Sequence, residues 1–391
     1  MNPIKPKLIR ITTVPMSLKI LLKGQHRFMS ENGFEVIGVS SSGQELQDVE
    51  QEENIRTISV EMTRTISLVK DLITLWNFYN LCKREKPLIV HSHTPKAGII
   101  GMLGAKLAKV PIRLHTVAGL PLMEAKGIKR VILDFVEKKT YSYATKVYPN
   151  SKGLFDFIIE NRYTSEEKLK IIGNGSSNGI NTNYFSLSKI TDEQKKQLRI
   201  DLNIAEIDFV FVFVGRLVRD KGINELVSAF SILQTLNNKL LLVGSQESDL
   251  DPLLPNTLEE IKSNANIISV GFQNDVRPYL AISNCLVFPS YREGFPNVVM
   301  QAGAMELPSI VSDINGCNEI IVQNENGIII PVKDEDSLKL AMIKLKEDEV
   351  LYEKLKQNSR SMIVSRYEQS VVWNALLNEY NTLLKEKGYN V

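Results

Sequence analysis

Two short segments in the second half of the chain carry charged residues in a pattern that suits a phosphorylated ligand. In the first, "GRLVRDKG" (215–222), an apolar run leads into Arg216 and Lys221, which stand between two glycines. A guanidinium presents a planar fork of donors and an ammonium presents a compact charge, so the pair matches a diphosphate. Two solvated surface charges would explain the residue types, but not their position directly after an apolar strand. We therefore expect an anion site here.

The second segment, "YREGFPNVVMQAGAM" (291–305), combines a turn with the start of a helix. Proline is common in a first helical turn, so the helix is expected to begin at Pro296 or Asn297. Its free N–H groups would offer a second contact to a phosphate. Glu293 can reach the hydroxyl groups of a polyol. Alternatively, its carboxylate only complements the helix dipole, but this would not explain the neighbouring glycine, the small residues and the Arg/Lys loop. The small residues 302–304 would let this helix lie close to a sheet or a ligand.

Both segments belong to a regular alternation of apolar strands and helices. Such alternation is typical of parallel sheets covered on both faces, and two series of six strands predict two doubly wound, Rossmann-like α/β domains. Ligands bind such sheets outside the carboxyl ends of the strands, so we expect two sets of loops facing a central cleft. The domains are placed at 1–186 and 187–391, and the second is expected to end in charged helices from about Asp334 onward. The predicted strands are 7–12, 35–40, 88–93, 112–117, 146–151 and 168–173 in the first domain, and 209–215, 239–244, 266–271, 285–290, 309–313 and 327–331 in the second.

The composition is that of an ordinary globular protein, with 43% hydrophobic and 24% charged residues in a chain of 391. Three cysteines lie far apart without a CxxC pair, which excludes a disulfide framework and fits a reducing cytosol. The N-terminal segment has no long apolar stretch typical of a signal peptide. No run approaches the roughly 18 apolar residues of a membrane span. These features predict a cytoplasmic location.

The net charge of +2 conceals an asymmetry. Residues 1–186 hold 26 Lys and Arg against 17 Asp and Glu, a net +9, and residues 187–391 hold 21 against 28, a net −7. A basic first half suggests an anionic partner, although an uneven surface charge without function explains it too. The segment 12–29 adds an apolar ridge beside lysines: Leu18, Leu21 and Leu22 with Lys19 and Lys23. This ridge would lie on a membrane surface or receive a lipid tail; an ordinary amphipathic helix packed on its sheet is equally compatible.

Taken together, these segments resemble glycosyltransferase family 4, the retaining enzymes of the GT-B fold. Nearly the whole chain takes part in the resemblance. Within the family, it is similar to bacterial members that extend lipid-pyrophosphate-linked sugars in capsule or O-antigen assembly. The matching motifs are "GRLVRDKG" (215–222), "LLVGSQE" (241–247), "VGFQNDV" (270–276) and "VFPSYREGFPNVVMQAGAMELPSIVSD" (287–313), with "HSHTPKAG" (91–98), "HTVAGLP" (115–121) and "NGSSNGIN" (174–181) in the first half.

The resemblance implies roles for the second domain as the nucleotide-sugar donor domain. Arg216 and Lys221 would hold the diphosphate, and Glu293 would contact hydroxyl groups of the donor sugar. The loop at 271–272 would read the base. Gln301 stands where the family has a second glutamate, which bonds the ribose hydroxyls, so ribose recognition is expected to differ here. The expected donor-binding residues are Gly215, Arg216, Lys221, Gly271, Phe272, Gly294, Phe295, Pro296, Asn297, Val298 and Gln301.

The first domain would hold the acceptor and contribute a histidine. His115 matches the family histidine that reaches the donor sugar, so it joins Glu293 as an expected catalytic residue; a satisfied packing histidine is the alternative. His91 and His93 alternate on one strand, but a zinc site would need further ligands at suitable spacing. No Asp-x-Asp motif stands at a predicted strand end, so no metal is expected. The acceptor-side candidates are Ser17, Lys19, His93 and Asn178.

The implied reaction is transfer of a sugar, with retention, from a nucleoside diphosphate to an acceptor hydroxyl. The donor would be UDP-linked and carry a hexose or N-acetylhexosamine. The acceptor would be a glycan or a polyprenyl-pyrophosphate-linked sugar in surface polysaccharide synthesis. No cofactor and no nucleic-acid partner are expected, and the protein would be cytoplasmic or peripheral on the inner face of the cytoplasmic membrane. Two alternatives stay open: a nucleotide-sugar 2-epimerase of the same fold, for which no acid and base residues can be placed, and a non-catalytic nucleotide-sugar-binding protein.

Overall fold

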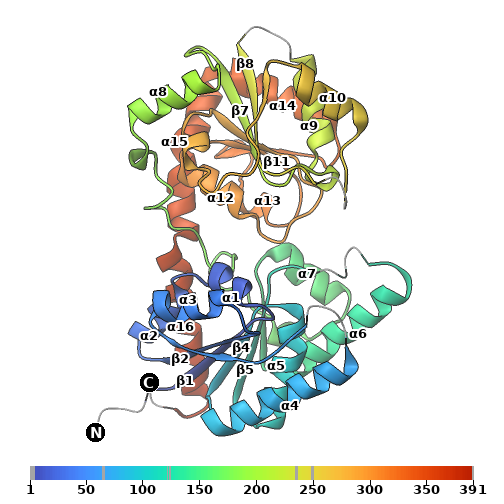
Figure 1. The fold of residues 1–391 in the computed structure, drawn as a ribbon, viewed down its shortest axis with the longest axis vertical. Coiled ribbons are helices and arrows are strands. Elements are labelled where there is room, and N and C mark those ends of the chain that lie inside the picture. The colour runs from blue at the N-terminus through green and yellow to red at the C-terminus, as the bar shows by residue number, and fades with distance from the viewer. Residues whose placement is uncertain are drawn as a thin grey trace. The chain divides into compact units, whose positions relative to one another are not determined.

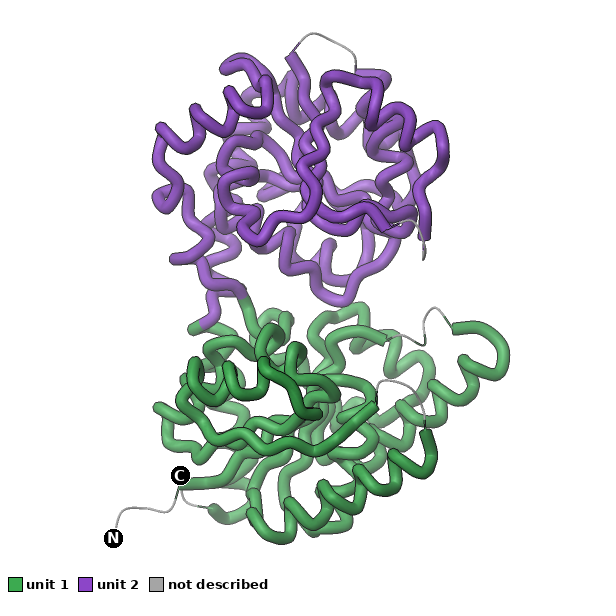
Figure 2. Tube along the Cα trace, in the orientation of Figure 1, with its two compact units in different colours: residues 1–179, 370–391 green, residues 180–369 purple. Residues whose placement is uncertain are grey.

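The computed structural model describes residues 5–63, 67–120, 122, 125–233, 237–247 and 251–389. The chain forms two compact units (Figure 2). Unit 1 is Met1–Gly179 with Ser370–Val391, and unit 2 is Ile180–Gln369. The chain thus leaves unit 1 seven residues before the boundary expected at 186, and its last helix belongs to unit 1 rather than to the second domain.

Unit 1 is built on a six-stranded parallel sheet. Its strand order is β3-β2-β1-β4-β5-β6, and every neighbouring pair is parallel. The strands are β1 (Lys7–Ile11), β2 (Glu35–Ser40), β3 (Arg56–Ser59), β4 (Ile89–Ser92), β5 (Ile112–Val117) and β6 (Lys146–Pro149). The order reverses between β1 and β4, which makes this pair the switch point where doubly wound sheets bind ligands.

Unit 2 repeats the same connectivity. Its order is β12-β11-β10-β7-β8-β9, again parallel throughout, with the switch point between β7 and β10. The strands are β7 (Phe209–Val214), β8 (Asn238–Val243), β9 (Ile267–Ser269), β10 (Cys285–Phe288), β11 (Ser309–Ser312) and β12 (Gly327–Ile330). The prediction of two doubly wound α/β domains is confirmed.

Helices cover both faces of each sheet. In unit 1, α4, α5 and α6 lie on one side of the sheet and α1, α2 and α3 on the other (Figure 1). The helices of unit 1 are α1 (Pro15–Leu21), α2 (Gln25–Glu31), α3 (Gln44–Glu53), α4 (Leu68–Glu85), α5 (Pro95–Leu107), α6 (Gly127–Tyr143) and α7 (Lys152–Glu160), joined by α16 (Gln369–Glu386). Those of unit 2 are α8 (Asp192–Asp201), α9 (Ile223–Ile232), α10 (Pro255–Ser263), α11 (Arg277–Ala281), α12 (Asn297–Ala304), α13 (Cys317–Ile320), α14 (Glu335–Glu347) and α15 (Glu349–Tyr367).

The last helix returns to unit 1 because its apolar face completes a core there. Leu376, Tyr380 and Leu384 of α16 are buried in a cluster with Leu8 of β1 and Phe34. The Tyr380 hydroxyl also hydrogen-bonds His91 Nδ1 on β4 at 2.6 Å. The helical prediction for the C-terminal segment was correct, but its assignment to the second domain was wrong, because the contacts that place it are remote in sequence.

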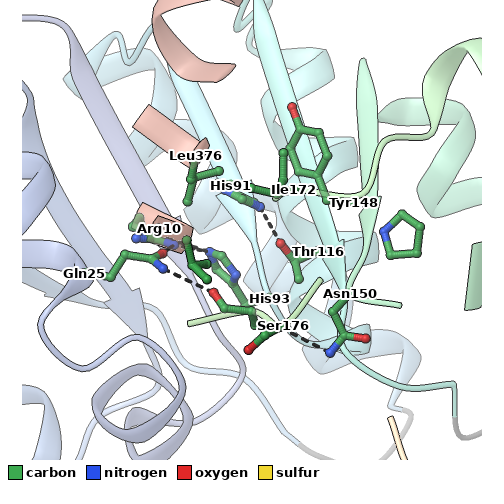
Figure 3. A pocket seen from close by; sticks show the side chains of 13 residues that line it. Arg10, Gln25, His91, His93, Thr116, Tyr148, Asn150, Ile172, Ser176 and Leu376 are labelled. Carbon is green, nitrogen blue, oxygen red and sulfur yellow. Dashed lines mark hydrogen bonds between the residues drawn. The ribbon is translucent and has the colours of Figure 1, made fainter. Parts of the chain in front are cut away.

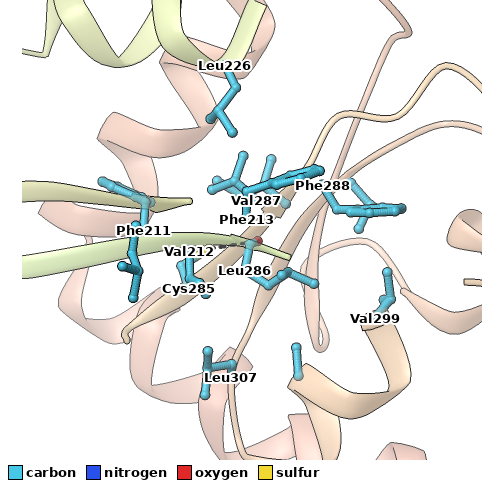
Figure 4. Close-up of a cluster of buried hydrophobic side chains, with 14 of the residues drawn as sticks. Phe211, Val212, Phe213, Leu226, Cys285, Leu286, Val287, Phe288, Val299 and Leu307 are labelled. Atoms are coloured by element: carbon cyan, nitrogen blue, oxygen red, sulfur yellow. Dashed lines mark hydrogen bonds between the residues drawn. The ribbon is translucent and has the colours of Figure 1, made fainter. Parts of the chain in front are cut away.

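The core of unit 2 explains why its strands read as continuous apolar runs. Side chains of β7 and β10 project to both faces of the sheet and are buried on both (Figure 4). Phe211, Phe213 and Leu286 are all fully buried. Each of the six strands predicted for this half is present.

Two strand predictions in unit 1 differ from the structure. Residues 168–173 form no strand; Leu169 makes only an isolated bridge to Val147. The sixth strand is instead β3, which the sequence did not reveal because it is a four-residue, weakly apolar edge strand with exposed ends and a half-buried middle.

Two other expectations concern disulfide bonds and membrane-spanning helices. Cys82, Cys285 and Cys317 are free and buried, in agreement with the prediction that no disulfide framework exists. Among the helices that the structure describes, none has both the length and the apolar character needed to cross a membrane.

Candidate active site

A lysine and a glutamate meet at the switch point of unit 2. Lys221 follows β7 in a short 3-10 turn, and Glu293 follows β10. Lys221 Nζ and Glu293 Oε1 form an ion pair, and each side chain is 16% exposed. Ser290 Oγ donates a hydrogen bond to the same carboxylate oxygen at 3.0 Å. The sequence predicted both charged residues for the site but not their direct contact.

The two loops that carry this pair are tied together by their backbones. Gly222 has φ +70°, and a Cβ there would lie 2.2 Å from the Pro289 carbonyl oxygen, so only glycine permits this approach. The Tyr291 N–H donates to the Asp220 carbonyl at 2.9 Å, and Arg292 forms an ion pair with the Asp220 carboxylate. The position of Lys221 relative to the β10 loop is therefore fixed by the chain itself.

A third strand end supports the turn that follows Glu293. Asn315, beyond β11, donates from Nδ2 to the carbonyl oxygens of Glu293 at 3.1 Å and Gly294 at 2.6 Å. The next residue, Gly316, lies so close that a Cβ would be 2.7 Å from the Gly294 oxygen. The sequence analysis missed this support, because nothing local connects Asn315 with a turn about twenty residues earlier.

Arg216 lies beside a carboxylate that was not assigned a role. Its Nη1 is 2.8 Å from Glu247 Oε2, and its side chain is 51% exposed. Glu247 comes after β8 at the end of the "LLVGSQE" motif, which was the available signal. Arg216 and Lys221 are thus each paired with a carboxylate, and an incoming diphosphate would compete with Glu247 and Glu293 for them.

Helix α12 begins at Asn297, as predicted, and its first turn lacks a side-chain cap. The N-cap residue is Pro296, which offers no capping side chain. The N–H groups of Asn297 and Val298 therefore point to where an anion would be stabilised by the helix dipole. The small residues have another role than expected. A Cβ at Gly303 would lie 2.6 Å from Ile363 of α15, so the close neighbour is a helix and not a sheet or a ligand.

The remaining donor-side candidates lie at the edge of these loops. Gln301 is half-buried one turn further along α12, and its side chain makes no hydrogen bond to another described residue. Phe272 is 70% exposed beside Gly271, in the loop after β9. Phe295 packs edge-on against Tyr367, with ring centroids 5.5 Å apart, which gives it a structural role as well.

In unit 1, His115 is buried beside Ser92. Its Nδ1 lies 2.8 Å from Ser92 Oγ, and that hydroxyl also donates to the Leu114 carbonyl at 3.3 Å. Because the Ser92 hydroxyl donates its own proton to Leu114, it accepts a hydrogen bond from Nδ1–H of His115. The other ring nitrogen, Nε2, then carries no proton and is an acceptor. Burial lowers the pKa of His115 to about 4, so the ring is neutral at physiological pH. Gly98 makes room for it, since a Cβ there would lie 2.6 Å from Cε1.

His91 of β4 and His93, which directly follows that strand, belong to a buried network around a cavity of about 20 Å³, space for one water molecule (Figure 3). His91 bonds Tyr380 and Thr116 through its two nitrogens. His93 Nε2 lies 3.2 Å from Arg10 Nη2, and Arg10 also donates to Gln25. Burial lowers the pKa of His91 and of His93 well below the usual value, and neighbouring charges lower each further. No group of three metal-ligating side chains occurs in the described ranges of the chain.

The acceptor-side candidates do not gather into one site. The Asn178 side chain links three segments: it accepts from Trp373 and Gln25 and donates to the Lys23 carbonyl. Lys19 pairs with Asp48 and Glu52, and Ser17 is half-buried on α1. Only His93 lines the cavity described above. The sequence missed Arg10, which looks like an ordinary member of an apolar strand.

The predicted ridge in residues 12–29 does not face solvent as a unit. Leu18 and Leu22 are fully buried in the core beneath α1, whereas Leu21 is 36% exposed. The packed amphipathic helix, left open as the alternative, is therefore what the structure shows for two of the three leucines.

Comparisons with known proteins now identify the family. A model described as "Glycosyl transferase 4-like domain" matches residues 27–175, and "Glycosyl transferases group 1" matches residues 194–362. The "Capsular polysaccharide biosynthesis glycosyltransferase CapM" of Staphylococcus aureus is 35% identical over 387 residues, which cover 97% of this chain and 98% of that protein. The chain therefore belongs to the glycosyltransferase family that these two models and this relative represent. It is a transferase enzyme, as the sequence predicted.

Two further proteins resemble this glycosyltransferase. An Escherichia coli enzyme, "UDP-Gal:alpha-D-GlcNAc-diphosphoundecaprenol alpha-1,3-galactosyltransferase", is 32% identical over 317 residues, 78% of either chain. The structure of Anabaena Alr3699/HepE in complex with UDP matches with a TM-score of 0.81 over 97% of this chain and all of that one, at 15% identity. The second likeness concerns the fold alone and confirms the GT-B architecture.

Proposed function

We propose that this glycosyltransferase moves a hexose or N-acetylhexosamine from a UDP-linked donor to a hydroxyl of a sugar carried on a polyprenyl diphosphate. The reaction proceeds with retention and serves surface polysaccharide synthesis, at the inner face of the cytoplasmic membrane. The names of two relatives support this proposal. That of the Escherichia coli enzyme gives UDP-Gal as donor and a diphosphoundecaprenol-linked sugar as acceptor, and that of CapM refers to capsular polysaccharide biosynthesis.

The observation that carries the proposal is the convergence of positive groups on the switch point of unit 2. Lys221 and Arg216 follow β7, while the uncapped start of α12 follows β10. Ammonium, guanidinium and helix N–H groups together suit the several oxygens of a diphosphate. Glu293, next to them, suits the hydroxyl groups of the sugar that the diphosphate carries.

The chemistry follows from which groups these residues can stabilise. As the bond from the anomeric carbon to the diphosphate oxygen breaks, negative charge grows on the leaving group, where Lys221 and Arg216 stabilise it. Binding of the diphosphate releases Glu293 from Lys221, and the carboxylate then stabilises the positive charge that develops on the sugar ring. In unit 1, His115 has a neutral ring with Nε2 as its acceptor, which suits a hydrogen bond from a sugar hydroxyl.

A retaining hydrolase that works by double displacement has two carboxylates about 5 Å apart, one of them the nucleophile. Among the described residues near Glu293, the companion position holds the amide Gln301, which is a poor nucleophile. We therefore propose attack from the same face as the leaving group. The acceptor oxygen forms the new bond to the anomeric carbon, and its proton passes to an oxygen of the departing diphosphate.

A transfer assay tests the proposal. The full chain is incubated with a panel of UDP-sugars and a synthetic N-acetylhexosaminyl diphospholipid, and the product is analysed by mass spectrometry and proton NMR. We expect an extended lipid with the donor's anomeric configuration. An inverted product would contradict the retaining mechanism. Epimerised donor without any acceptor would instead support the 2-epimerase, and donor binding without turnover would support the non-catalytic binder.

A further inference from the structure

Unit 1 presents an apolar surface that has no role in the sites described above. Nine large apolar side chains of α4 and α6 are between 44% and 81% exposed. Large apolar side chains exposed in such number mark the place of a protein or membrane partner. We call these residues the α4/α6 face: Leu68, Val69, Leu72, Ile73 and Trp76 on α4, and Ile128, Val131, Ile132 and Phe135 on α6.

On each helix these residues form one stripe that is separate from the core. The exposed positions on α6 recur at intervals of three and four, the spacing of one helical face. On α4, the core is served by other residues, among them Phe78 and Leu81, which are buried in the cluster beneath the helix. On α6 the buried residues are Glu137, Thr140 and Tyr141, so on both helices the exposed apolar residues gather in the first half and most core contacts in the second.

The two stripes lie at the same end of the unit. In a parallel sheet, helices that follow β3 and β5 both begin at the carboxyl ends of the strands. α4 and α6 both pack against α5 on one side of the sheet (Figure 1). Each stripe becomes polar toward the other end of its helix: Asn80 and Lys83 continue the stripe of α4, and Lys139 and Ser142 that of α6.

The surroundings of the stripes are basic. Exposed lysines stand next to or between the apolar residues, while the nearby acids Asp71 and Asp134 are held in ion pairs with Lys96 and Arg130. Unit 1 as a whole carries 28 Lys and Arg against 19 Asp and Glu, whereas unit 2 carries 19 against 26. The exposed lysines are Lys70, Lys126, Lys129, Lys138 and Lys139.

We propose that the α4/α6 face docks unit 1 onto an anionic phospholipid bilayer. Lysine is depleted at protein–protein interfaces, but lysine beside exposed apolar residues is favoured at anionic membranes. Trp76, whose ring stacks on Tyr79 at 5.6 Å, has the amphipathic character that suits the headgroup region. The inference deepens the proposed use of a membrane-held acceptor and rests on it. It also moves the expected membrane surface from residues 12–29 to α4 and α6.

Trp76 reports directly on this docking, because the chain has two tryptophans and the other, Trp373, is partly buried and hydrogen-bonded to Asn178. A Trp373→Phe variant isolates its signal. We expect vesicles of equal parts phosphatidylglycerol and phosphatidylcholine to shift Trp76 emission to shorter wavelength, and brominated acyl chains to quench it. Pure phosphatidylcholine vesicles should have a much smaller effect, and added salt should weaken binding.

Matched variants locate the surface by vesicle co-sedimentation of the full chain. Leu72→Ser with Ile128→Ser should lower partitioning by about 10-fold or more, because their apolar surface no longer enters the interface. Lys126→Gln with Lys129→Gln should lower it by about 10-fold on anionic vesicles only. Val350→Ser, an equally exposed apolar position on α15 in unit 2, is the control and should change nothing.

Three results would overturn the inference. One is unchanged Trp76 emission in anionic vesicles, and another is equal loss of binding in the Val350→Ser control. The third is concentration-dependent self-association, or binding of another protein, that the Leu72→Ser and Ile128→Ser substitutions abolish while vesicles have no effect. None of these assays contains a donor or an acceptor, so failure here leaves the proposed transfer reaction to be decided by its own assay.

Discussion

The two units share one strand order but hold their polar residues in opposite ways. At the switch point of unit 2, Lys221 and Glu293 pair across two loops and remain partly exposed. At the switch point of unit 1, Arg10 and His93 are buried among neutral partners, and Arg10 forms no ion pair with any described residue. The same topology therefore supports an open, charged site in one unit and a closed, hydrogen-bonded network in the other.

This difference shows that the fold provides the place for a ligand, while the residues at the strand ends decide what is bound there. Partly exposed ion pairs can exchange their partners for a diphosphate. His91, whose two ring nitrogens bond Tyr380 and Thr116, holds segments of unit 1 together and should change little on binding.

The largest effect that separates the units is expected in acid. All four histidines lie in unit 1 and none in unit 2. Burial lowers the pKa of His115 to about 4 and those of His26, His91 and His93 well below the usual value. The unfolded chain therefore binds protons below pH about 6.5 that folded unit 1 does not bind. Unit 1 should lose stability as the pH falls from 6.5 toward 4, by up to ~1.4 kcal/mol per pH unit for each histidine.

Tryptophan fluorescence measures this loss selectively, because Trp76 and Trp373 are both in unit 1. Its thermal midpoint should fall with pH more steeply than the calorimetric transition of unit 2. A His26→Leu variant should flatten the slope. Parallel pH dependence of the two transitions would show that the histidines titrate normally in the folded state.

Glu293→Gln tests the open site of unit 2. Removing the charge should lower kcat by about 100-fold or more if the carboxylate stabilises the developing positive charge. UDP affinity should be unchanged or higher, because Lys221 is no longer held by an ion pair. Loss of UDP binding with kcat retained would mean that Glu293 only shapes the loop.

The two cations of that site should differ in their contribution. Lys221→Ala and Arg216→Ala should each lower kcat/KM by about 10- to 100-fold, since a charge-assisted hydrogen bond is worth ~1.5–3 kcal/mol. The larger loss is expected for Lys221, which is less exposed than Arg216. Arg219→Ala in the same loop, 63% exposed, is the control and should be near wild type. Equal, small effects of all three would remove the diphosphate assignment.

The smallest effect is expected at Gln301. Gln301→Leu should raise the donor KM several-fold with little change in kcat, because ribose contacts bind ground and transition states alike. Gln301→Glu should keep activity within about 10-fold, since stronger ribose bonding opposes repulsion from the diphosphate. If Gln301→Leu binds donor as the wild type does, the residue only packs.

The sequence predicted the features that depend on neighbours along the chain. The strands of unit 2, the start of α12 and the position of Arg216 and Lys221 after β7 depend on local patterns, and the structure has each where it was predicted. Edge strand β3 was missed, because four half-exposed residues carry little apolar signal. The return of α16 to unit 1 depends on contacts such as Tyr380 with His91, which no local pattern reveals.

The same reason explains what was missed in the site. Glu247 and Asn315 act on residues from other strand ends, and only the folded sheet brings these ends together. Arg10 was overlooked because a charged residue inside "KLIRIT" looks like a solvent-facing strand position. In the structure it is fully buried.

Calorimetric titration of UDP into the wild type and Lys221→Ala, each in EDTA, tests the central claim most directly. The claim is that side-chain cations at the switch point of unit 2 hold a nucleoside diphosphate. We predict that the wild type binds UDP without a divalent ion and that Lys221→Ala binds it about 10-fold more weakly. Equal affinity of the two proteins, or wild-type binding that disappears in EDTA and returns with magnesium, would contradict it.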